Sequence, residues 1–436
     1  MRLRNLLADT RPLADPGFRR LWIGEIVTVI GAQLTVVAVP AQIYAITGSS
    51  AYVGLTGVFG VVPLIVFGLY GGALADAMDR RTLLWVSTAG LIVTSALFWV
   101  QAVAGLGNVW LLLVLFAVQQ AFFAVNSPTR SAILPKLLPP VLLPAANSLT
   151  TTVFQAGAIA GPLVAGVLIP VLGYSWLYLI DTLTLFATLF AALSLPRLPV
   201  EGGAPTPGLR SVVEGFGYLR HQPVLLMSFL VDIIAMVFGM PRALFPQMAH
   251  LDFGGPVDGG LAFSLLFAAI PAGAVIGGVF SGWVSRVQRH GVAVVVAIVV
   301  WGLAMVGFGV AGGLADGGGG VLLGAAVLML VIGGAADMVS SSFRQAILQS
   351  ASTDAVRGRL QGVFTVVVVG GPRVADVAHG GVAAVAGTAV AAAGGGVLVV
   401  IGVMVSALAV PAFVRYRLAP PEGQSEPGPG TTSPLS

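Results

Sequence analysis

Charge is the scarcest property of this chain. Only 9% of its 436 residues are Asp, Glu, Lys or Arg, whereas 57% are hydrophobic. A water-soluble domain has roughly a quarter of its residues charged, enough to coat its surface. The chain lacks that polar coat, so we expect lipid to cover its apolar surface.

Cysteine is absent altogether, which excludes disulfide bonds, thiolate metal sites and a cysteine nucleophile. Histidine occurs only four times, and the sequence shows neither a Ser/His/Asp set nor a metal-ligand cluster. The phosphate-binding pattern Gly-x4-Gly-Lys-Ser/Thr does not occur, so ATP is not the expected energy source. We therefore expect no enzymatic activity, no metal and no bound cofactor.

Long apolar runs dominate the chain. A helix needs about 20 apolar residues to cross a bilayer, and twelve such runs occur, six on each side of a polar segment. They lie at 21–46, 52–75, 83–105, 109–127, 145–170, 174–195, 224–249, 260–284, 291–313, 320–343, 360–384 and 388–413. Glycine and proline interrupt the fifth and eleventh runs. The first run is followed at once by others, so we expect a membrane span and not a cleaved signal. The predicted fold class is an all-α integral membrane protein with twelve transmembrane helices.

The polar segment divides the chain into two halves. We predict an N-terminal six-helix half over 1–195 and a C-terminal one over 224–414. The cytoplasmic linker, 196–223, begins with Gly and Pro and continues with apolar residues at helical spacing, which predicts an amphipathic helix on the membrane surface. The tail, 415–436, is rich in Pro, Gly, Ser and Thr and is expected to be disordered.

Basic residues fix the expected orientation, because cytoplasmic loops collect Lys and Arg. With the N-terminus inside, 19 of the 21 basic residues fall on the cytoplasmic side, and only Arg242 and Arg373 do not. This bias accounts for the net charge of +4 without a nucleic-acid partner. Both termini are expected in the cytoplasm.

The two halves echo each other in sequence. Ser127-Pro-Thr-Arg130-Ser-Ala-Ile-Leu134 recurs as Ser341-Ser-Phe-Arg344-Gln-Ala-Ile-Leu348, at an offset of 214 residues. Each copy ends an even-numbered span. Transporters built from parallel six-span repeats place their substrate site between the two halves.

A charged hinge separates the second and third runs, with Gly72, Asp76, Arg80 and Arg81 in or beside it. This loop resembles the signature loop of the major facilitator superfamily of transporters. The resemblance implies that Asp76 engages the other half, that Arg80 and Arg81 pair with it, and that the loop then holds the cytoplasmic side closed. Ala77 departs from the family's basic residue. The alternative is that the two arginines only anchor the topology.

The fifth run contains Gly157, Gly161, Pro162 and Gly166, and resembles the Gly-Pro motif of exporters in this superfamily. Glycines four residues apart line one helix face and allow close packing. Proline frees a carbonyl group and bends the helix. The motif favours export, although packing alone also explains it.

Longer segments resemble the enterobactin exporters: Val37–Ile43, Arg242–Pro246, Ala268–Gly277 and Asp354–Gly362. The resemblance implies a monomeric secondary exporter of a siderophore-like compound in the plasma membrane, driven by the proton motive force. A multidrug or macrolide exporter of the same fold is the main alternative. Uptake stays open because gradients set the direction, and a membrane enzyme or receptor has little support.

Ionisable groups within the apolar runs are costly and therefore candidates for function. Arg373, Asp376 and His379 are three residues apart, so they are predicted to share one side of a helix. They could carry a proton, form a neutral structural pair or bind an anionic substrate. Asp232 and Asp337 are further candidates for proton coupling, and either could pair with Arg344. The remaining groups are Glu25, expected near the inner boundary, and Asp181, expected to be structural, with Gln33, Gln42, Gln119, Gln120 and Asn126 as candidate cavity residues.

Overall fold

The structure is a computed structural model that describes residues 9–196, 217–318, 320–351 and 354–417. Side chains are described for these residues except 69–77, 285, 351, 354–366 and 369. Most of the predicted amphipathic helix of the linker and most of the C-terminal tail lie outside the described residues. All regular secondary structure in the described part of the chain is helical.

Eleven long helices form the body of the described part of the chain. They are α1 (Pro16–Thr47), α2 (Ser50–Ala77), α3 (Arg80–Val103), α4 (Val109–Leu137), α5 (Leu143–Leu193), α7 (Pro223–Gly239), α9 (Leu261–Val279), α10 (His290–Ala315), α11 (Gly320–Ala351), α12 (Asp354–Ala386) and α13 (Thr388–Ala409). The short elements are η2 (Arg11–Ala14), η3 (Pro140–Leu142), η4 (Arg242–Leu244), α8 (Phe245–Gln247), the π-helix η5 (Met248–Asp252), η6 (Ser281–Arg286) and α14 (Pro411–Val414).

These helices account for the twelve predicted spans. Ten segments of the described chain are long and apolar enough to cross a membrane. One of them holds two spans, because α5 reverses at Gly173, whose φ of 77° is available to glycine at little cost. Helix α12 supplies the remaining span. The prediction of an all-α membrane protein with twelve transmembrane helices is confirmed.

Two helix ends differ from the apolar runs. Helix α4 continues to Leu137, beyond the apolar run that ends at residue 127. The additional part contains the repeated Ser-x-x-Arg segment, which the apolar run did not include because it is polar. Helix α7 stops at Gly239, before the run ends at 249, because Pro241 disfavours the helical conformation at Met240. Met240 has φ −107° and ψ 91°, and the chain then continues as η4, α8 and η5.

Side chains fix where several helices begin. Asp15 accepts a hydrogen bond of 2.8 Å from the Phe18 N–H at the start of α1. Asp79 accepts one of 3.0 Å from the Thr82 N–H at the start of α3. Each satisfies an amide that has no partner inside its helix. Asp15 and Asp79 thus mark the points where α1 and α3 begin.

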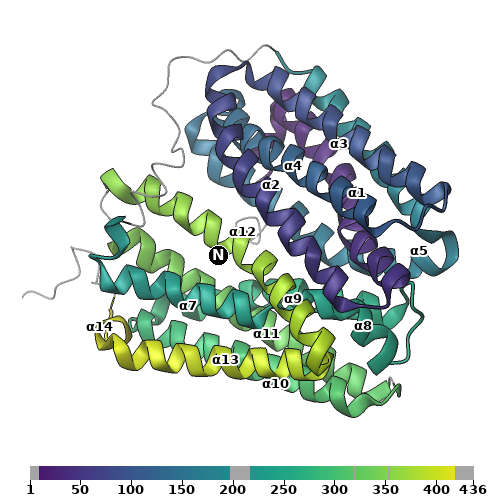
Figure 1. Ribbon diagram of the computed structural model, residues 1–436. Coiled ribbons are helices and arrows are strands. Elements are labelled where there is room, and N and C mark those ends of the chain that lie inside the picture. Colours follow the sequence, from purple (N-terminus) through teal and green to yellow (C-terminus); the bar gives the residue numbers. More distant parts are fainter. Residues whose placement is uncertain (1–8, 197–216, 319, 352–353, 418–436) are drawn as a thin grey trace, which may run out of the picture.

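The helices form two bundles, α1–α5 and α7–α14, which Figure 1 shows in purple to blue and in green to yellow. We call the end of the molecule that holds the start of α1 and the α2–α3 connection the inner end, after the predicted orientation. The opposite end, which holds the α1–α2 connection and α8, is the outer end. In Figure 1, α2 and α12 converge toward the lower right and diverge toward the inner end at the upper left.

One seam between the halves, which we call the α2–α12 seam, depends on glycine. Gly54 and Gly57 of α2 pack against backbone carbonyl groups of Asp376 and Arg373 on α12. A methyl group at Gly380 would lie 2.5 Å from the Ser50 carbonyl oxygen. Without side chains at these positions the two backbones come into direct contact.

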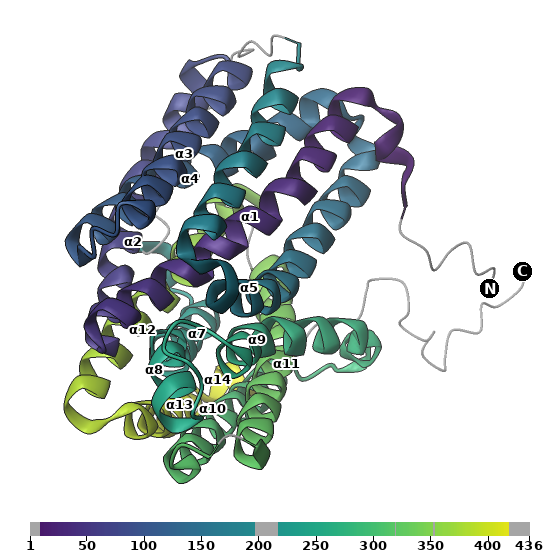
Figure 2. The same ribbon diagram turned by 90° about the vertical axis from the view of Figure 1, so that its right-hand side faces the viewer.

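A second seam joins α5 to α9, in the middle of Figure 2. The Gly260 N–H donates a hydrogen bond of 3.0 Å to the Gly166 carbonyl oxygen, and Gly166 also abuts Ser264. At the same end the Ser50 hydroxyl donates a bond of 2.7 Å to Gln247 Oε1 of α8. These contacts lie toward the outer end, so the structure is closed there.

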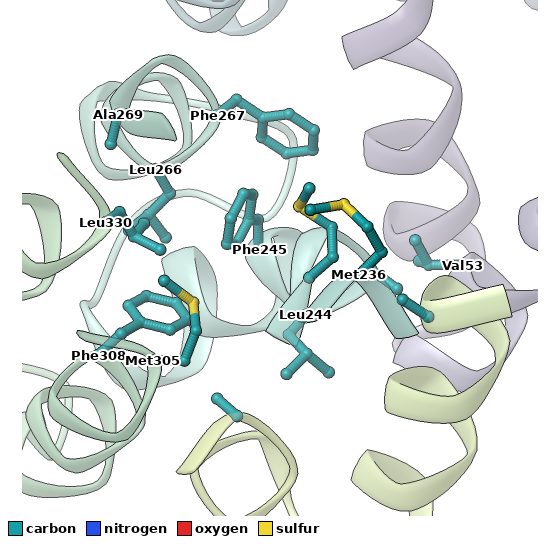
Figure 3. Close-up of a cluster of buried hydrophobic side chains, with 14 of the residues drawn as sticks. Val53, Met236, Leu244, Phe245, Leu266, Phe267, Ala269, Met305, Phe308 and Leu330 are labelled. Atoms are coloured by element: carbon teal, nitrogen blue, oxygen red, sulfur yellow. The ribbon is translucent and has the colours of Figure 1, made fainter. Parts of the chain in front are cut away.

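The core of the second half is aromatic where it meets the first half (Figure 3). Phe245 makes edge-to-face contacts with Phe267, at 5.1 Å between ring centroids, and with Phe308, at 5.8 Å. Such pairs stabilise beyond their buried area and hold the rings in defined orientations. Val53 of α2 extends this core across the boundary.

Two adjacent glycines of α12, Gly380 and Gly381, allow a paired test of the close packing at the α2–α12 seam. Gly380→Ala puts a methyl group against the Ser50 carbonyl oxygen, whereas Gly381→Ala meets open space. Overpacking costs about 1–3 kcal/mol, so we expect Gly380→Ala to open the outer end and Gly381→Ala to leave it closed. The cysteine-free chain allows spin labels at Leu106→Cys and Val257→Cys, whose separation reports this opening. Equal distance distributions in the two variants would contradict the expectation.

Candidate functional site

A pocket between the two halves brings together charged and aromatic side chains. Helices α1, α2 and α4 line it from the first half, and η4, α9 and α12 from the second. Val36, Val39, Pro40, Val53 and Thr56 form most of the first half's wall. Phe116, Phe267, Arg242, Arg373 and Asp376 supply the rings and charges. We call these five residues the charged pocket.

Arg373 reaches across the boundary between the halves. Its guanidinium carbon lies 5.2 Å from the centre of the Phe116 ring on α4, within the range of a cation–π interaction. Gly60 of α2 makes room for it, because a methyl group there would lie 3.2 Å from the same carbon. The contact therefore ties α12 to α4 while the outer end is closed.

Arg242 reaches the pocket because α7 ends early. Pro241 stops that helix, and Arg242 opens the short helix η4 beside the pocket. Arg242 and Arg373 are the two basic residues that violate the inside bias of the sequence, and the structure brings both to one pocket. With Asp376, which is 5% exposed, they give the pocket two positive charges and one negative.

Phe267 is held in the pocket wall by the aromatic core of the second half. It makes an edge-to-face contact with Phe245 and a tilted contact with Phe263, at 4.8 Å between centroids. Phe116 faces it from the first half as another ring in the lining. A ligand between the halves would therefore meet aromatic surface on both sides.

His379 is separated from the other two members of its sequence triplet. Its Nδ1 bonds to the Ala375 carbonyl oxygen at 3.0 Å. Its Nε2 faces α13, where a methyl group at Gly395 would lie 2.8 Å away. Arg373 and Asp376 instead line the pocket, so only two of the three predicted residues belong to the charged pocket.

Asp232 and Asp337 belong to a different group of charges, nearer the inner end. Arg344 of α11 forms an ion pair with Asp232 of α7, and its Nη2 lies 3.6 Å from Asp337 Oδ1. The side chains of Arg344 and Asp232 are 4% and 1% exposed, whereas that of Asp337 is 28% exposed. The structure thus realises the predicted pairing with Arg344.

The first half holds a matching pair. Arg130 Nη1 of α4 lies 3.3 Å from Glu25 Oε1 of α1. Sequence reasoning placed Glu25 at the inner boundary and did not identify Arg130 as its partner. The sequence repeat that contains Arg130 and Arg344 was the available signal, because it includes the arginine of each ion pair.

The hinge arginines bond within their own half. Arg80 Nη1 donates to the Ala132 carbonyl oxygen of α4 at 3.1 Å, and Arg81 Nη2 to that of Leu193 in α5 at 2.5 Å. Leu193 is the last residue of α5, where a cation interacts favourably with carbonyl groups that have no partner inside the helix. Gly72 and Asp76 belong to the backbone of α2, but their side-chain surroundings lie outside the described residues.

The glycines of the Gly-Pro motif have two kinds of neighbour. Gly157 packs against Val29 and Gly161 against Gln33, both on α1. Gly166, one turn beyond Pro162, instead packs against Ser264 in the other half. The motif therefore tightens the first half and also forms part of the seam between the halves.

Several buried polar groups hold the first half together. Asp181 Oδ2 accepts hydrogen bonds from the Thr35 and Ser95 hydroxyl groups, at 2.7 and 2.8 Å, which links α5 to α1 and α3. The Tyr178 hydroxyl donates to Gln42 Oε1 at 2.8 Å. Asn126, like Gln42, bonds to neighbouring helices of this half. These two amides, considered for the cavity, are part of the helix packing.

Comparison with known proteins agrees with this architecture. The family of transmembrane secretion effectors, MFS_3, matches residues 8–427. The chain belongs to this family of the major facilitator superfamily. An enterobactin exporter, EntS, of Citrobacter koseri is 27% identical over 417 residues, covering 94% of this chain and 96% of the relative. That of Escherichia coli O157:H7 is 28% identical over 415 residues, covering 95% and 96%.

Solved transporter structures share the fold. A peptide transporter POT variant has a TM-score of 0.72 at 13% identity, covering 92% of this chain and 95% of that chain. A bacterial homologue of the human lysosomal transporter Spinster, inward-facing and unoccupied, has a TM-score of 0.69 at 16% identity, covering 94% and 100%. The family match makes the protein a multi-pass membrane transporter, and these likenesses show that it has the same fold.

The ion pairs of Arg344 predict which of two substitutions destabilises the folded protein more. Arg344→Gln leaves the carboxyl groups of Asp232 and Asp337 without their cation, and removing one partner of a buried ion pair costs about 3–5 kcal/mol. Asp232→Asn leaves Arg344 beside Asp337 and should cost less. Thermal unfolding of the purified variants in detergent measures both, with Arg130→Gln as the matched change in the first half. Equal losses for Arg344→Gln and Asp232→Asn would contradict this ordering.

Proposed function

We propose that this protein exports a siderophore of the enterobactin type across the plasma membrane. It works by alternating access as a monomer, with both termini in the cytoplasm and the proton motive force as the driving force. The names of its relatives support the substrate class, and their alignment covers more than nine-tenths of the chain. The architecture of two packed halves supports the transport cycle.

The charged pocket is the proposed substrate site. Catecholate siderophores present aromatic faces and anionic oxygens. Guanidinium groups bind such oxygens through charge-assisted hydrogen bonds, and phenylalanine rings pack against aromatic faces. The observation that carries the proposal is that Arg242 and Arg373, the two exceptions to the basic bias, line one pocket with Phe116 and Phe267.

The closed outer end represents the inward-facing state of this cycle. Export then requires α2 to separate from α12, which withdraws Arg373 from Phe116. That movement takes one wall of the pocket away from the bound anion. Opening of the outer end and release of the substrate therefore occur together. Asp376 limits the pocket's net positive charge, which prevents an anionic substrate from being held too tightly to leave.

The hinge arginines take part in the opposite closure. In the inward-facing state they bond to carbonyl groups of α4 and α5. When the inner end closes, Asp76 engages the second half, and Arg80 and Arg81 pair with it. Gly72 allows the close approach of the two halves at this end.

Multidrug efflux is the second candidate function. It is favoured by the apolar wall that Val36, Val39, Pro40 and Val53 contribute to the pocket. Such a wall accepts amphipathic molecules without a specific hydrogen-bond pattern. The two functions differ in how strongly they depend on the arginines.

Siderophore release separates the two candidates. The gene is expressed in an enterobactin-producing host that lacks its own exporter and is starved of iron, and catecholate is measured in the medium. We expect the protein to restore release. Unchanged release together with raised resistance to amphipathic drugs would support multidrug efflux and contradict siderophore export.

Within this assay, Arg373→Gln tests the site. Losing a hydrogen bond to a charged group costs about 1.5–3 kcal/mol, so we expect release to fall by roughly tenfold or more. Arg415→Gln, which removes an exposed arginine after α14, serves as the control and should release normally. Membrane levels of each variant are measured by immunoblot. Normal release by Arg373→Gln at equal levels would rule out Arg373 as a ligand.

A further inference from the structure

The acid–arginine pairs of the two halves occupy matching places. Glu25 and Asp232 each lie nine residues after the first residue of their helix, Pro16 in α1 and Pro223 in α7. Their partners, Arg130 and Arg344, are the repeated arginines at the offset of 214 residues. The repeat thus placed one carboxylate–guanidinium pair near the inner end of each half.

The second half breaks this symmetry with an additional acid. At the same offset, the residue of the first half that corresponds to Asp337 is Phe123. Asp337 lies 3.6 Å from Arg344, which already forms an ion pair with Asp232. One guanidinium group therefore faces two carboxyl groups, whereas among the described side chains of the first half the Arg130 guanidinium group pairs with the carboxyl group of Glu25 alone.

Charge balance decides what the additional acid does. Two ionised carboxylates beside a single cation would leave a net negative charge inside the membrane, which is strongly unfavourable. A bound proton removes that charge without any movement of the helices. Asp337 is the carboxyl group to receive it, because Asp232 holds the closer ion pair and only Asp337 is appreciably exposed.

The surroundings of Asp337 offer no second cation among the described side chains of the helices nearest it. Helix α9 contains no ionisable residue, and in α10 only the first residue, His290, can titrate. His290 packs against Phe343, beside Arg344 and toward the inner end, and Arg286 ends η6 there. The described charges of α12 are Arg373, Asp376 and His379, in the charged pocket or against α13.

A buried hydroxyl group adds an independent observation. Ser340 lies three residues after Asp337 and four before Arg344, so all three share one face of α11. Its side chain is 1% exposed, and its oxygen has no hydrogen-bond partner among the described residues. A hydroxyl group placed there can accept from a protonated carboxyl group and donate to an ionised one.

We propose that Asp337, beside Arg344 and Asp232, is the binding site of the coupling proton. The inference rests on the proposed proton-driven transport and assigns that role to one side chain. In this inward-facing state Asp337 is protonated and Arg344 is paired with Asp232. Loss of the proton leaves two carboxylates competing for Arg344, which favours a rearrangement between α7 and α11 and so links protonation to the transition between the two states.

The test follows the conformation directly and needs no substrate. The full-length protein in lipid nanodiscs is spin-labelled at Val141→Cys and Gln288→Cys, at the inner ends of the two halves. Distances between the labels are measured from acidic to neutral pH. We expect the distribution of the parent protein to shift with pH and that of Asp337→Asn to be independent of pH. Asp258→Asn, which changes a carboxyl group in the outer loop, should respond like the parent.

Asp337→Glu keeps the carboxyl group and should retain the pH response, with a displaced midpoint. It also serves as the test variant if Asp337→Asn does not fold. A full response in Asp337→Asn, no response in the parent protein or an undisplaced midpoint in Asp337→Glu would overturn the assignment. Failure of siderophore release with loss of the response in Asp337→Asn would leave the proton site standing and remove only the substrate proposal.

Discussion

The cost of placing charge in lipid determines the rest of this structure. Unpaired ionised groups are excluded from a hydrocarbon interior, so each charge retained within the spans needs a partner. The inner-end acids are matched with Arg130 and Arg344, and Arg373 lies over an aromatic ring beside Asp376. Asp181 is held by hydroxyl groups, because its Oδ2 accepts hydrogen bonds from Thr35 and Ser95. Charges that remain under such a constraint are concentrated where the protein binds or moves.

Close approach of helices is the second requirement, and glycine supplies it. Lipid provides no hydrophobic force between helices, so packing depends on contact between surfaces. In both seams the contact partners of glycine include backbone carbonyl groups of the other half. Such seams are closely packed but contain few side-chain interactions that link one half to the other. They can therefore separate without first breaking a network of bonds, which suits the opening of this boundary in the proposed cycle.

Sequence patterns predicted the spans and the two halves because apolar length and basic bias are properties of single segments. They did not predict contacts between segments. Arg373, Asp376 and His379 are spaced by three, but each step of three falls 60° short of a full helical revolution, so His379 faces α13 instead of the pocket. Pro241 ends α7 inside an apolar run because it disfavours the helical conformation of the preceding residue. A hydropathy pattern does not predict this end, because it measures only how apolar a segment is. Phe116 and Phe267 carried no signal, because their role arises only where α4 and α9 line the same pocket.

The repeat explains how the two halves can share one architecture and still have different roles. Duplication gave each half an acid–arginine pair at its inner end, a symmetric scaffold that is electrically balanced. A change of state then requires a difference between the halves, because an acid–arginine pair with no net charge gains nothing by rearranging. The hinge loop contains an acid only in the first half, whereas the second half alone has an additional acid in place of Phe123 and both pocket arginines. In the proposed mechanism, closure of the inner end and response to charge therefore reside in opposite halves, and each transition passes through the boundary where the substrate is proposed to bind.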